Sequence, residues 1–536
     1  MAADPKKSAP APGGDDSPKL KTMRRLVARA ELDRNKHQSR LADCYRYTMP
    51  WRHKFYQTTQ SAAAPDIDVI FDETAGVVLE DFAADMLNTF TPQKNNWVTV
   101  APVEKLDAGQ SNVIREQLAD YQRVVFGSMA RSNLYMALQE GYMDLGPGTM
   151  ALLITDIDPA KPFHCEAIPA PDLLITRGPY GYVDGVFRRK HYLRSEIKTL
   201  WPDADLTKIA PEPTDGTDPD YEVTDGCWRD WSNKSDEVYE YVVQAGGKII
   251  YEKTWKGAGA CPFIVARWGH DSTTAWGCGP TYRTLPAIKT LNHFAFTSLK
   301  NYDKHVDPVV SYEDDGVMNI DNGVTPGTWV PRAPDSKPPE VVESKARFDV
   351  QAFEIDEKRS IIRKAHYQDR PEQQGKTPPS ATQWADEAAE RARRMGTPAT
   401  TLVHELQYPL FRRFAWLESQ RGTLPKVKLE GQEVALQPIS PLLRAQEQEA
   451  VVRRDKFVEL MVGRFGPQVG MIVVDIVAYA QKQGKDIGVE PELIRNENDI
   501  AEAIKKFLPV LQSTSGGGAG DLGAPALGAI TGGAPV

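Results

Sequence analysis

The sequence predicts an α+β fold that is mainly helical. Two amphipathic segments, residues 286–306 and 347–367, have helical periodicity and flank a stretch rich in Pro, Gly and Asp that contains too many turn-forming residues to be a helix. Short runs of β-branched and aromatic residues, separated by Gly, Pro and Asp, fill residues 150–267 and indicate a sheet. Helical periodicity returns on both sides of these two regions. Helices therefore outweigh strands in the expected fold.

The N-terminal part of the chain is expected to contain three helices. Residues 1–18 lack an apolar core of the kind found in signal peptides and are expected to form a disordered leader. The first helix begins at Ser17–Pro18, an N-cap followed by a Pro in the first turn, and ends near Pro50. The second and third are expected from about Asp72 to Thr91 and from about 112 to 142.

The β-type region contains candidate strands and one hairpin turn. The candidate strands are residues 151–155, 172–176, 183–193, 237–244 and 248–253. Gly246–Gly247 joins the last two of them, and Gly–Gly is a strong two-residue hairpin signal. Antiparallel pairing of these two strands is therefore expected.

The two amphipathic segments are expected to pack as a helical hairpin. The first starts at Pro286, which suits a first helical turn because its missing N–H would be unpaired there. Their apolar stripes supply the expected packing residues, Ile288, Leu291, Leu299, Ile355 and Ile362. Residues 307–346 between them carry the turn signals Asp321–Gly323 and Thr325–Gly327, so a small β module is expected at the tip of the hairpin.

Beyond the hairpin, the chain is expected to form a loop, a long helix and a set of shorter helices. Residues 368–380 form a polar loop, because each of their prolines removes a helical donor. The segment 381–437 starts with a helix that runs to about Arg421, with kinks or breaks at Gly396–Pro398 and Pro409, and ends in two short strands. Helices follow over 438–512, and the Gly/Ala-rich residues 513–536 form a flexible tail.

Composition and charge restrict the function. The chain has 536 residues, a net charge of −9 and 41% hydrophobic residues, which does not fit a basic protein that reads a DNA groove. Its most apolar stretch, around residues 470–480, is short and interrupted by Asp475, so no membrane span is expected. The five cysteines are odd in number and lack C-x-x-C spacing. They are expected to be reduced, buried thiols and not zinc ligands.

Several short segments match part of a catalytic motif, but the residues around each match do not fit that motif. Gly518–Gly523 fits the dinucleotide pattern, but no strand precedes it and no helix follows. Gly375–Thr377 resembles the end of a phosphate loop, yet Pro378 follows where a helix should start. His404–Glu405 lacks the second histidine of a zinc protease, and turn formation explains Asp314, Asp315 and Asp321 better than a nuclease centre. No enzyme, metal or cofactor is therefore predicted.

Basic residues crowd the second helix of the hairpin. They are Lys358, Arg359, Arg363 and Lys364. Such a run is usually a solvated face or a surface for ion pairs between subunits. The functional alternative is that some of these side chains line a DNA channel, and the sequence leaves both open.

Three segments resemble a known family in their residues and order. They are DETAGVVLEDFAADMLNTFTPQKNNWVTV at 72–100, CPFIVARWGHDSTTAWGCGPTYRTLPAIKTLN at 261–292, and ATQWADEAAERARRMGTPATTLVHELQYPLFRRFAWLESQRGTLP at 381–425. Together they resemble the portal, or head-to-tail connector, proteins of short-tailed (podovirus-type) tailed bacteriophages. In that family the first is a helix that delivers a Trp into a strand, the second a strand, a Gly-rich turn and the lead-in to a stem helix, and the third a long kinked helix.

The resemblance implies a ring of about twelve copies, closed by heterologous contacts. Its parts would be an α/β wing (19–285), two stem helices (286–306 and 347–367), a β clip (307–346), a tunnel loop (368–380), a long kinked wing helix with strands (381–437) and a helical crown (438–512). Transient DNA contacts would come from tunnel-loop residues Arg370, Gln373, Gln374 and Lys376, although an ordinary surface loop is the alternative. Docking at the clip would use Tyr312, Asp314, Asp315, Trp329 and Arg332.

The implied function is a conduit at one capsid vertex through which double-stranded DNA is packaged and ejected. The implied partners are the terminase large subunit, then tail adaptor or gatekeeper proteins, with the major capsid and scaffolding proteins around the ring. Assembly in the host cytoplasm and a final place in the virion follow from the same resemblance. The alternatives are another virion structural protein, such as a tail or capsid component, or a nucleic-acid-processing hydrolase.

Overall fold

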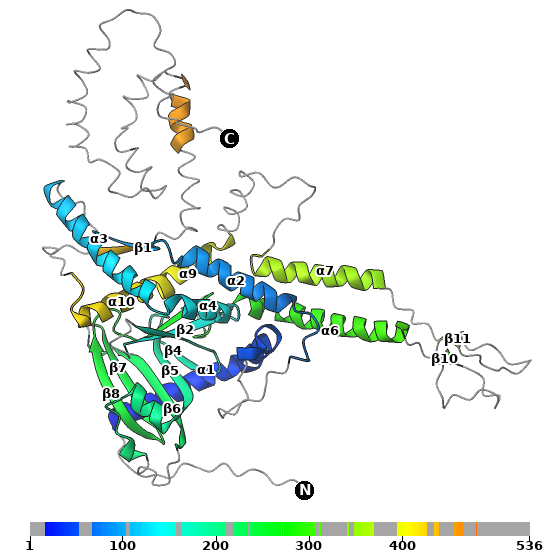
Figure 1. The fold of residues 1–536 in the computed structure, drawn as a ribbon, viewed down its shortest axis with the longest axis horizontal. Helices are drawn as coiled ribbons and strands as arrows, with labels where there is room; N and C mark the ends of the chain where they lie inside the picture. The colour runs from blue at the N-terminus through cyan, green and yellow to red at the C-terminus, as the bar shows by residue number, and fades with distance from the viewer. Residues whose placement is uncertain are drawn as a thin grey trace, which may run out of the picture. The chain divides into compact units, whose positions relative to one another are not determined.

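The computed structural model divides the chain into two units, Met1–Leu442 and Leu443–Val536. It describes residues 17–52, 67–102, 108–156, 163–209, 218–233, 236–269, 271, 273–306, 310–311, 340–341, 348–368, 394–425, 434–438, 454–461, 463–464 and 479. Within the second unit, residues 454–461 are helical. The expected leader, tail and most of the expected crown lie outside the described residues. The prediction of a mixed fold of helices and sheets is confirmed in the first unit (Figure 1).

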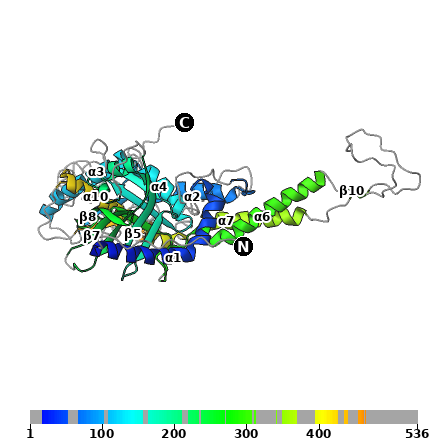
Figure 2. The same ribbon diagram turned by 90° about the horizontal axis from the view of Figure 1, so that it is seen from below.

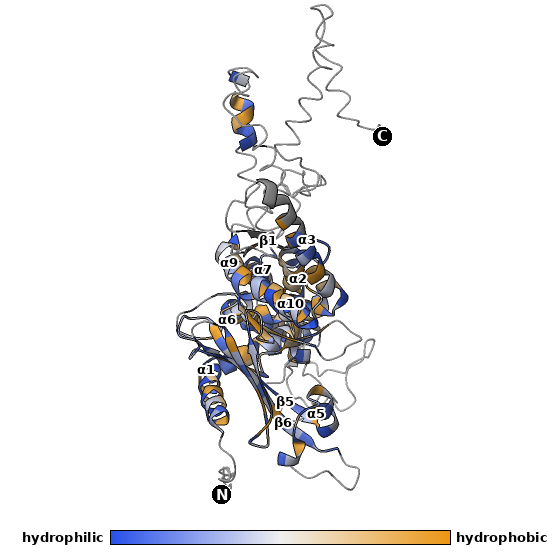
Figure 3. Cartoon of the chain, turned by 90° about the vertical axis from the view of Figure 1, so that its left-hand side faces the viewer, coloured by the Kyte–Doolittle hydropathy of each residue, from blue (hydrophilic) through white to orange (hydrophobic). Residues whose placement is uncertain are grey.

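A five-stranded antiparallel sheet is covered on one face by the first helix. The strands, in the order β4-β5-β6-β7-β8, are β4 (Leu173–Arg177), β5 (Val183–Leu193), β6 (Asp220–Asp230), β7 (Val238–Ala245) and β8 (Lys248–Lys256). Helix α1 (Pro18–Thr48) begins at the predicted N-cap, where the Ser17 hydroxyl accepts a hydrogen bond from the Leu20 N–H. Met23 of α1 packs against Phe187 and Val242 of the sheet. Figure 3 shows α1 alongside the sheet, with its residues alternating between hydrophobic and hydrophilic.

A second, three-stranded sheet has the order β3-β2-β9 and is also antiparallel. Its strands are β3 (His164–Ile168), β2 (Thr149–Thr155) and β9 (Phe263–Arg267). Helices α2 (Thr74–Phe90) and α4 (Leu134–Leu145) pack on each other, and α4 packs on β2 and β3. A separate strand pair joins β1 (Val98–Pro102) to β12 (Val434–Pro438). Short helical segments at α5 (Arg194–Leu200), Pro50–Arg52 and Leu206–Lys208 complete this part.

The predicted third helix is interrupted. The sequence predicted one helix over 112–142, but the structure has α3 (Ala108–Arg131) and α4 with a turn between them. The Ser132 hydroxyl accepts a hydrogen bond from the Leu134 N–H. The Asn133 side chain makes two bonds of 2.8 Å to the backbone of Cys165. Because Ser and Asn compete with helical bonding through their side chains, the break falls at these two residues.

All five predicted strands of the β-type region are present, and the sequence missed others. Gly246 and Gly247 have φ of 55° and 79°, so the predicted hairpin turn needs glycine at both positions. Strand β6, in the middle of the larger sheet, was not predicted because its acidic residues and Gly226 resemble a turn. A Cβ at Gly226 would lie 2.1 Å from Cδ1 of Phe187, so the glycine makes room for that ring. Strands β1 and β9 lie where the family resemblance places strands.

The predicted helical hairpin is formed by α6 (Pro280–Val306) and α7 (Phe348–Ala365), which lie side by side in Figures 1 and 2. The expected start of the first helix at residue 286 is wrong: Pro280 occupies the first position, and Pro286 lies inside the helix. The first turns are anchored by Thr281, whose N–H donates to the Gly146 carbonyl at 3.0 Å. Beyond the hairpin, β10 (Val310–Ser311) pairs with β11 (Glu340–Val341) in an antiparallel ladder.

The long C-terminal helix of the first unit has three parts: α9 (Gly396–Leu402), a π-helix (Val403–Gln407) and α10 (Tyr408–Arg421). The π turn closes with a hydrogen bond from the Tyr408 N–H to the Val403 carbonyl. The kink or break expected at Pro409 takes the form of this π turn: the chain stays helical through Pro409, which lies in the first turn of α10 and cannot donate to the carbonyl of Glu405. Helix α10 ends at Arg421, as predicted, with Gly422 as a left-handed cap.

One buried ion pair connects these parts. Arg267, at the end of β9, is fully buried and donates from its backbone N–H and from Nε to the carboxylate of Glu405, each at 3.0 Å. Its Nη2 donates to the carbonyl of Gly181, in the turn between β4 and β5, at 3.3 Å. The pair therefore joins the π-helix to both sheets.

Replacing Gly226 by Ala tests the close contact in the larger sheet. The added Cβ would overlap the Phe187 ring, and such overpacking costs about 1–3 kcal/mol of the free energy of unfolding. Urea unfolding measures the change. Gly127→Ala is the matched control, because a Cβ there meets nothing within 4 Å in the helix α3 and should leave stability equal or slightly higher. If Gly226→Ala and Gly127→Ala lowered the free energy of unfolding equally, the proposed contact would be contradicted.

Candidate functional site

The base of the helical hairpin is a buried apolar cluster shared with helix α2. Ile288 and Leu291 of α6 and Ile362 of α7 are nearly or fully buried against Ala75 and Val78 of α2. Ile355 is partly buried against the same cluster. Four of the five packing residues named from the sequence therefore lie together at this base. The hairpin is fixed to the body of the chain through apolar contacts at one end.

The fifth packing residue differs from the expectation. Leu299 is 52% exposed, so in the single chain it does not pack between the helices. Tyr302 at 65%, Phe353 at 71% and Ile361 at 39% are also exposed on the two helices. Among the described residues, none covers these four side chains. Large exposed apolar groups of this kind mark interaction surfaces.

Polar bonds hold the chain segment before α2 against the hairpin. The side chain of Asn292 on α6 accepts a hydrogen bond from the Phe71 N–H at 2.7 Å and donates one to the Val69 carbonyl at 2.9 Å. Arg359 of α7 forms an ion pair with the buried carboxylate of Asp72 at 2.8 Å. Burial acts to raise the pKa of Asp72, but hydrogen bonds from Thr74 and Arg359 outweigh it and lower that pKa. These contacts position Arg359 against the body.

The four basic candidates on α7 therefore separate into two groups. Arg359 is committed to Asp72, and Lys358 lies 3.8 Å from Glu354 on the same helix. Arg363 and Lys364 are exposed. This difference could not be predicted from the sequence, because Asp72 lies 287 residues from its partner.

A buried histidine closes the end of α7. His366 is fully buried; its Nδ1 lies 2.9 Å from the Ile362 carbonyl, and its Nε2 lies 2.8 Å from the Thr281 hydroxyl on α6. Because a carbonyl can only accept, Nδ1 carries the proton and Nε2 accepts from the hydroxyl. Burial lowers the pKa of His366 to about 4. Next to it, Gln368 donates to the carboxylate of Asp85 on α2 at 2.8 Å.

These bonds fix the point at which the expected tunnel loop leaves the hairpin. Residues 369–393 lie outside the described residues, and with them Arg370, Gln373, Gln374 and Lys376. The same holds for the expected clip-docking residues Tyr312, Asp314, Asp315, Trp329 and Arg332. Of the two segments, the described residues are Gln368, at the start of the expected tunnel loop, and the strand pair β10 and β11 within the expected clip.

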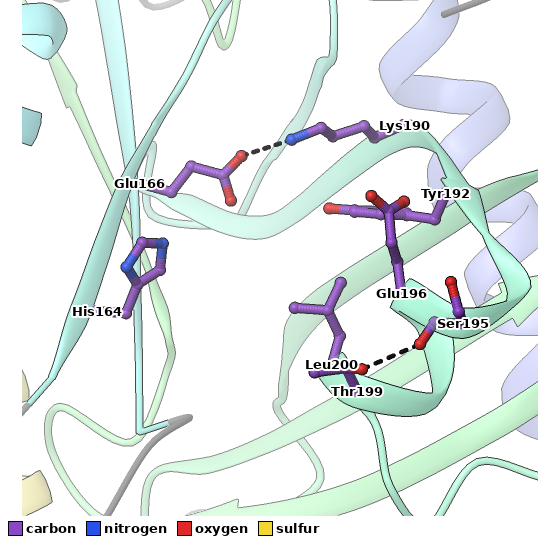
Figure 4. Close-up of a pocket in the computed structure, with 8 residues that line it drawn as sticks. All are labelled: His164, Glu166, Lys190, Tyr192, Ser195, Glu196, Thr199 and Leu200. Carbon is purple, nitrogen blue, oxygen red and sulfur yellow. Dashed lines mark hydrogen bonds and ion pairs between the residues drawn. The ribbon is translucent and has the colours of Figure 1, made fainter. Parts of the chain in front are cut away.

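A shallow charged pocket lies between β3, β5 and α5 (Figure 4). Its volume is about 430 Å³, and it is lined by His164, Glu166, Lys190, Tyr192, Ser195, Glu196, Thr199 and Leu200. Glu166 pairs with Arg188 and Lys190 at 2.6 and 2.9 Å, and these cations lower its pKa against the opposing effect of burial. The Ser195 hydroxyl donates to Asp218. The hydroxyls of Ser195 and Thr199 thus donate to a carboxylate and to the Ser195 carbonyl, and neither is bonded to a histidine base, so the arrangement does not resemble a nucleophilic centre.

The described residues contain neither a metal site nor a membrane helix. No group of three or more His, Cys, Asp or Glu side chains in the described ranges could hold a metal ion. None of the described helices is long and apolar enough to cross a bilayer. The five cysteines are free, and Cys44, Cys165 and Cys227 are buried, as the sequence predicted for small core residues.

Comparison with known proteins assigns the family. The family described as "Bacteriophage head to tail connecting protein" matches residues 20–494. The chain belongs to this family of phage head-to-tail connectors. It is 22% identical over 491 residues to the "Probable portal protein" of Bordetella phage BPP-1, covering 85% of each chain.

Two solved structures are also similar in part. One is titled "Virion of native gene transfer agent (GTA) particle", with a TM-score of 0.36 and 12% identity. The other is titled "Neck of empty GTA particle computed with C6 symmetry", with a TM-score of 0.37 and 13% identity. Each match covers 74% of this chain and 85% of the other.

The buried His366 predicts a loss of stability in acid. Its folded pKa of about 4 lies below its unfolded pKa of about 6.5, so the folded state favours the neutral ring. The stabilisation is complete above pH 6.5 and is lost as the pH falls from about 6.5 to about 4, by about 3 kcal/mol at most. Unfolding midpoints measured across this range should fall more steeply for the parent than for His366→Gln. The exposed His293→Gln on α6 is the control and should follow the parent; a His366→Gln profile parallel to the parent's would contradict the assignment.

Proposed function

We propose that the chain is the subunit of a portal, a closed ring at one vertex of a phage capsid that conducts double-stranded DNA. The match of the connector family over residues 20–494 carries this proposal. The portal name of the Bordetella phage relative, which aligns over 85% of both chains, supports it. The proposed role is structural and not catalytic, in accordance with the family.

Exposed apolar side chains on the hairpin support a ring. Leu299, Tyr302 and Phe353 are each more than half exposed in the single chain. In a ring, each hairpin would have another hairpin on either side, and the neighbours would cover these side chains. The family resemblance gives about twelve copies, joined by two different faces of each subunit. The hairpins would then surround the DNA channel.

The acidic chain suits a channel in which DNA must slide. Duplex DNA carries about one charge per 1.7 Å, and many fixed cations would hold it in place. A net charge of −9 keeps contacts weak. We assign transient phosphate contacts to the exposed Arg363 and Lys364, to Lys358 on the same helix, and to the expected tunnel-loop residues Arg370, Gln373, Gln374 and Lys376. Such contacts lack direction and sequence specificity, so they let the duplex advance.

The clip is proposed as the docking surface for other proteins. During filling it would bind the terminase large subunit, and afterwards tail adaptor or gatekeeper proteins. Tyr312, Asp314, Asp315, Trp329 and Arg332 are the proposed contact residues. The major capsid and scaffolding proteins would surround the ring, which would assemble in the host cytoplasm and remain in the virion.

Ring assembly should depend on Leu299. Negative-stain images of the parent are expected to show rings with a central hole. Leu299→Asp would bury a carboxylate at every contact between neighbours, which costs several kcal/mol without a partner and should reduce the ring fraction more than tenfold. Leu299→Met keeps an apolar side chain and should retain rings. Size-exclusion chromatography that shows intact Leu299→Asp rings, with a native circular dichroism spectrum, would remove Leu299 from the interface.

The clip should be dispensable for folding. Ser311 pairs directly with Glu340, so an Asn-Gly turn can replace residues 312–339 and close the ladder as a two-residue hairpin. The variant is expected to form rings with the parent's thermal midpoint. Pull-down with the terminase large subunit should fall to background, and binding at the parent's level would place the docking surface elsewhere.

The tunnel loop should affect DNA and not assembly. Arg370→Glu with Lys376→Glu is expected to leave rings intact but to lower the yield of DNA-filled heads several-fold, because repulsion replaces attraction to phosphate. The exposed wing residues Arg131→Glu with Lys248→Glu give a control of equal charge change. Equal yields of filled heads from both double variants and the parent would show that the loop charges have no role in the channel.

A further inference from the structure

Helix α1 has a basic outer face. Its sequence contains nine basic and three acidic residues, although the whole chain has a net charge of −9. Arg25, Arg29, Lys36 and Arg40 are exposed and recur at helical spacing on one side of the helix. Leu32 lies among them and is 69% exposed. These five residues form the basic face of α1.

The acidic residues of α1 are bonded to other parts of the chain. Glu31 pairs with Arg189 of β5 at 2.6 Å, Asp33 accepts a hydrogen bond from the Ala275 N–H at 3.0 Å, and Asp43 pairs with Lys289 of α6. Asp33 also lies 3.2 Å from Lys36 of the basic face. Arg25 and Arg29 have no carboxylate partner in the part of the chain that the structure describes. The basic face therefore carries charge that these acids do not neutralise.

Helix α2 has an acidic outer face. It contains three acidic residues and no basic residue. Glu73, at its N-cap, and Glu80 and Asp81 are exposed on the side that also carries Val77, which is 53% exposed. These four residues form the acidic face of α2. Among the described residues, no cation pairs with Glu73, Glu80 or Asp81.

The two faces are complementary in charge and in the position of an apolar side chain. In each face, an aliphatic side chain lies between two like charges at helical spacing. The sets are Arg29, Leu32 and Lys36 on α1, and Glu73, Val77 and Glu80 on α2. At about 1.5 Å per residue, each set extends over about 10 Å of its helix. A surface that is apolar at its centre and charged at its rim is typical of protein interfaces, and opposite charges select the partner.

The two helices lie on opposite sides of the larger sheet. Phe187 and Arg188 are neighbours in β5, so their side chains point to opposite faces. Phe187 packs on Met23 of α1, whereas Arg188 donates to Glu166 of β3 at 2.6 Å. Strand β3 packs on α4, and α4 packs on α2. Figures 2 and 3 show α1 and α2 on the two sides of this sheet. Each copy can therefore present one face to the preceding neighbour and the other to the following one.

We propose that the basic face of α1 in one copy binds the acidic face of α2 in the next copy of the ring. This inference rests on the proposed ring and adds a second contact to the one expected between hairpins. Leu32 packs on Val77 of the neighbour, and the four cations surround the three carboxylates. Because salt screens exposed charges, the contact is strongest at low ionic strength.

An exchange of charges in the full-length protein tests the contact. Arg25→Glu with Arg29→Glu places like charges opposite each other and should lower the fraction of rings about tenfold or more. Glu80→Arg with Asp81→Arg should do the same from the other side. All four substitutions together restore opposite charges and should return most of the rings. Negative-stain images and size-exclusion chromatography measure the ring fraction, and circular dichroism checks folding.

Two further sets of variants complete the test. Arg131→Glu with Lys256→Glu is the matched control, because it changes the charge equally at exposed residues of α3 and β8 outside both faces and should leave the rings unchanged. Leu32→Cys with Val77→Cys, treated with a short bis-maleimide, should give linked dimers and larger species on a denaturing gel. Each single cysteine variant should give none.

The possible failures are distinguishable. Rings that persist in both charge-reversed variants, a folded four-substitution variant without rings, or double-cysteine rings that do not crosslink would each overturn the contact and leave the portal proposal standing. A parent that forms no rings would overturn the ring and this contact together. If the α1 variant kept its rings but bound duplex DNA less tightly than the parent, the basic face would contact DNA phosphates and not a neighbouring copy.

Discussion

The burial of Arg267 is the constraint on which the first unit depends. A guanidinium without water must find charged and polar partners in the protein, and here the carboxylate of Glu405 and the carbonyl of Gly181 supply them. The two acceptors come from the π-helix and from a turn of the larger sheet, so the charge can be satisfied only when these parts are assembled together. Removal of one partner from such a pair typically costs about 3–5 kcal/mol. The same arginine ends the last strand before the hairpin, whose base is held by apolar contacts with α2.

Local signals in the sequence predicted the elements that depend on local physics. The capped start of α1, the Gly–Gly hairpin and the end of α10 before Gly422 each follow from a few neighbouring residues. Strand β6 was missed because the role of Gly226 depends on another strand. The glycine leaves room for the Phe187 ring of β5. Pro286 misled for the same reason, since tertiary contacts at Thr281 extend the helix past a residue that usually starts one.

The candidate site also contains features that local sequence signals predicted and features that they could not predict. Apolar periodicity identified the buried base of the hairpin, because a stripe of Ile and Leu predicts that a face is covered. Periodicity could not show how far along the hairpin α2 covers this apolar face. Leu299 lies on the same face but is not covered by α2. The ion pair of Arg359 with Asp72 and the buried His366 have no local signature at all, because their partners come from distant parts of the chain. Only a long-range contact map could have separated Arg359 from Arg363.

The π-helix also fixes which side chains of this segment face the core. A π turn accommodates one residue more than the α turn that it replaces. Glu405 lies within this turn, together with the buried Val403, Leu406 and Gln407. The loss of one residue within 403–407 would rotate these side chains about the helix axis and separate Glu405 from Arg267. The additional residue of the π turn is therefore held in place by the buried pair.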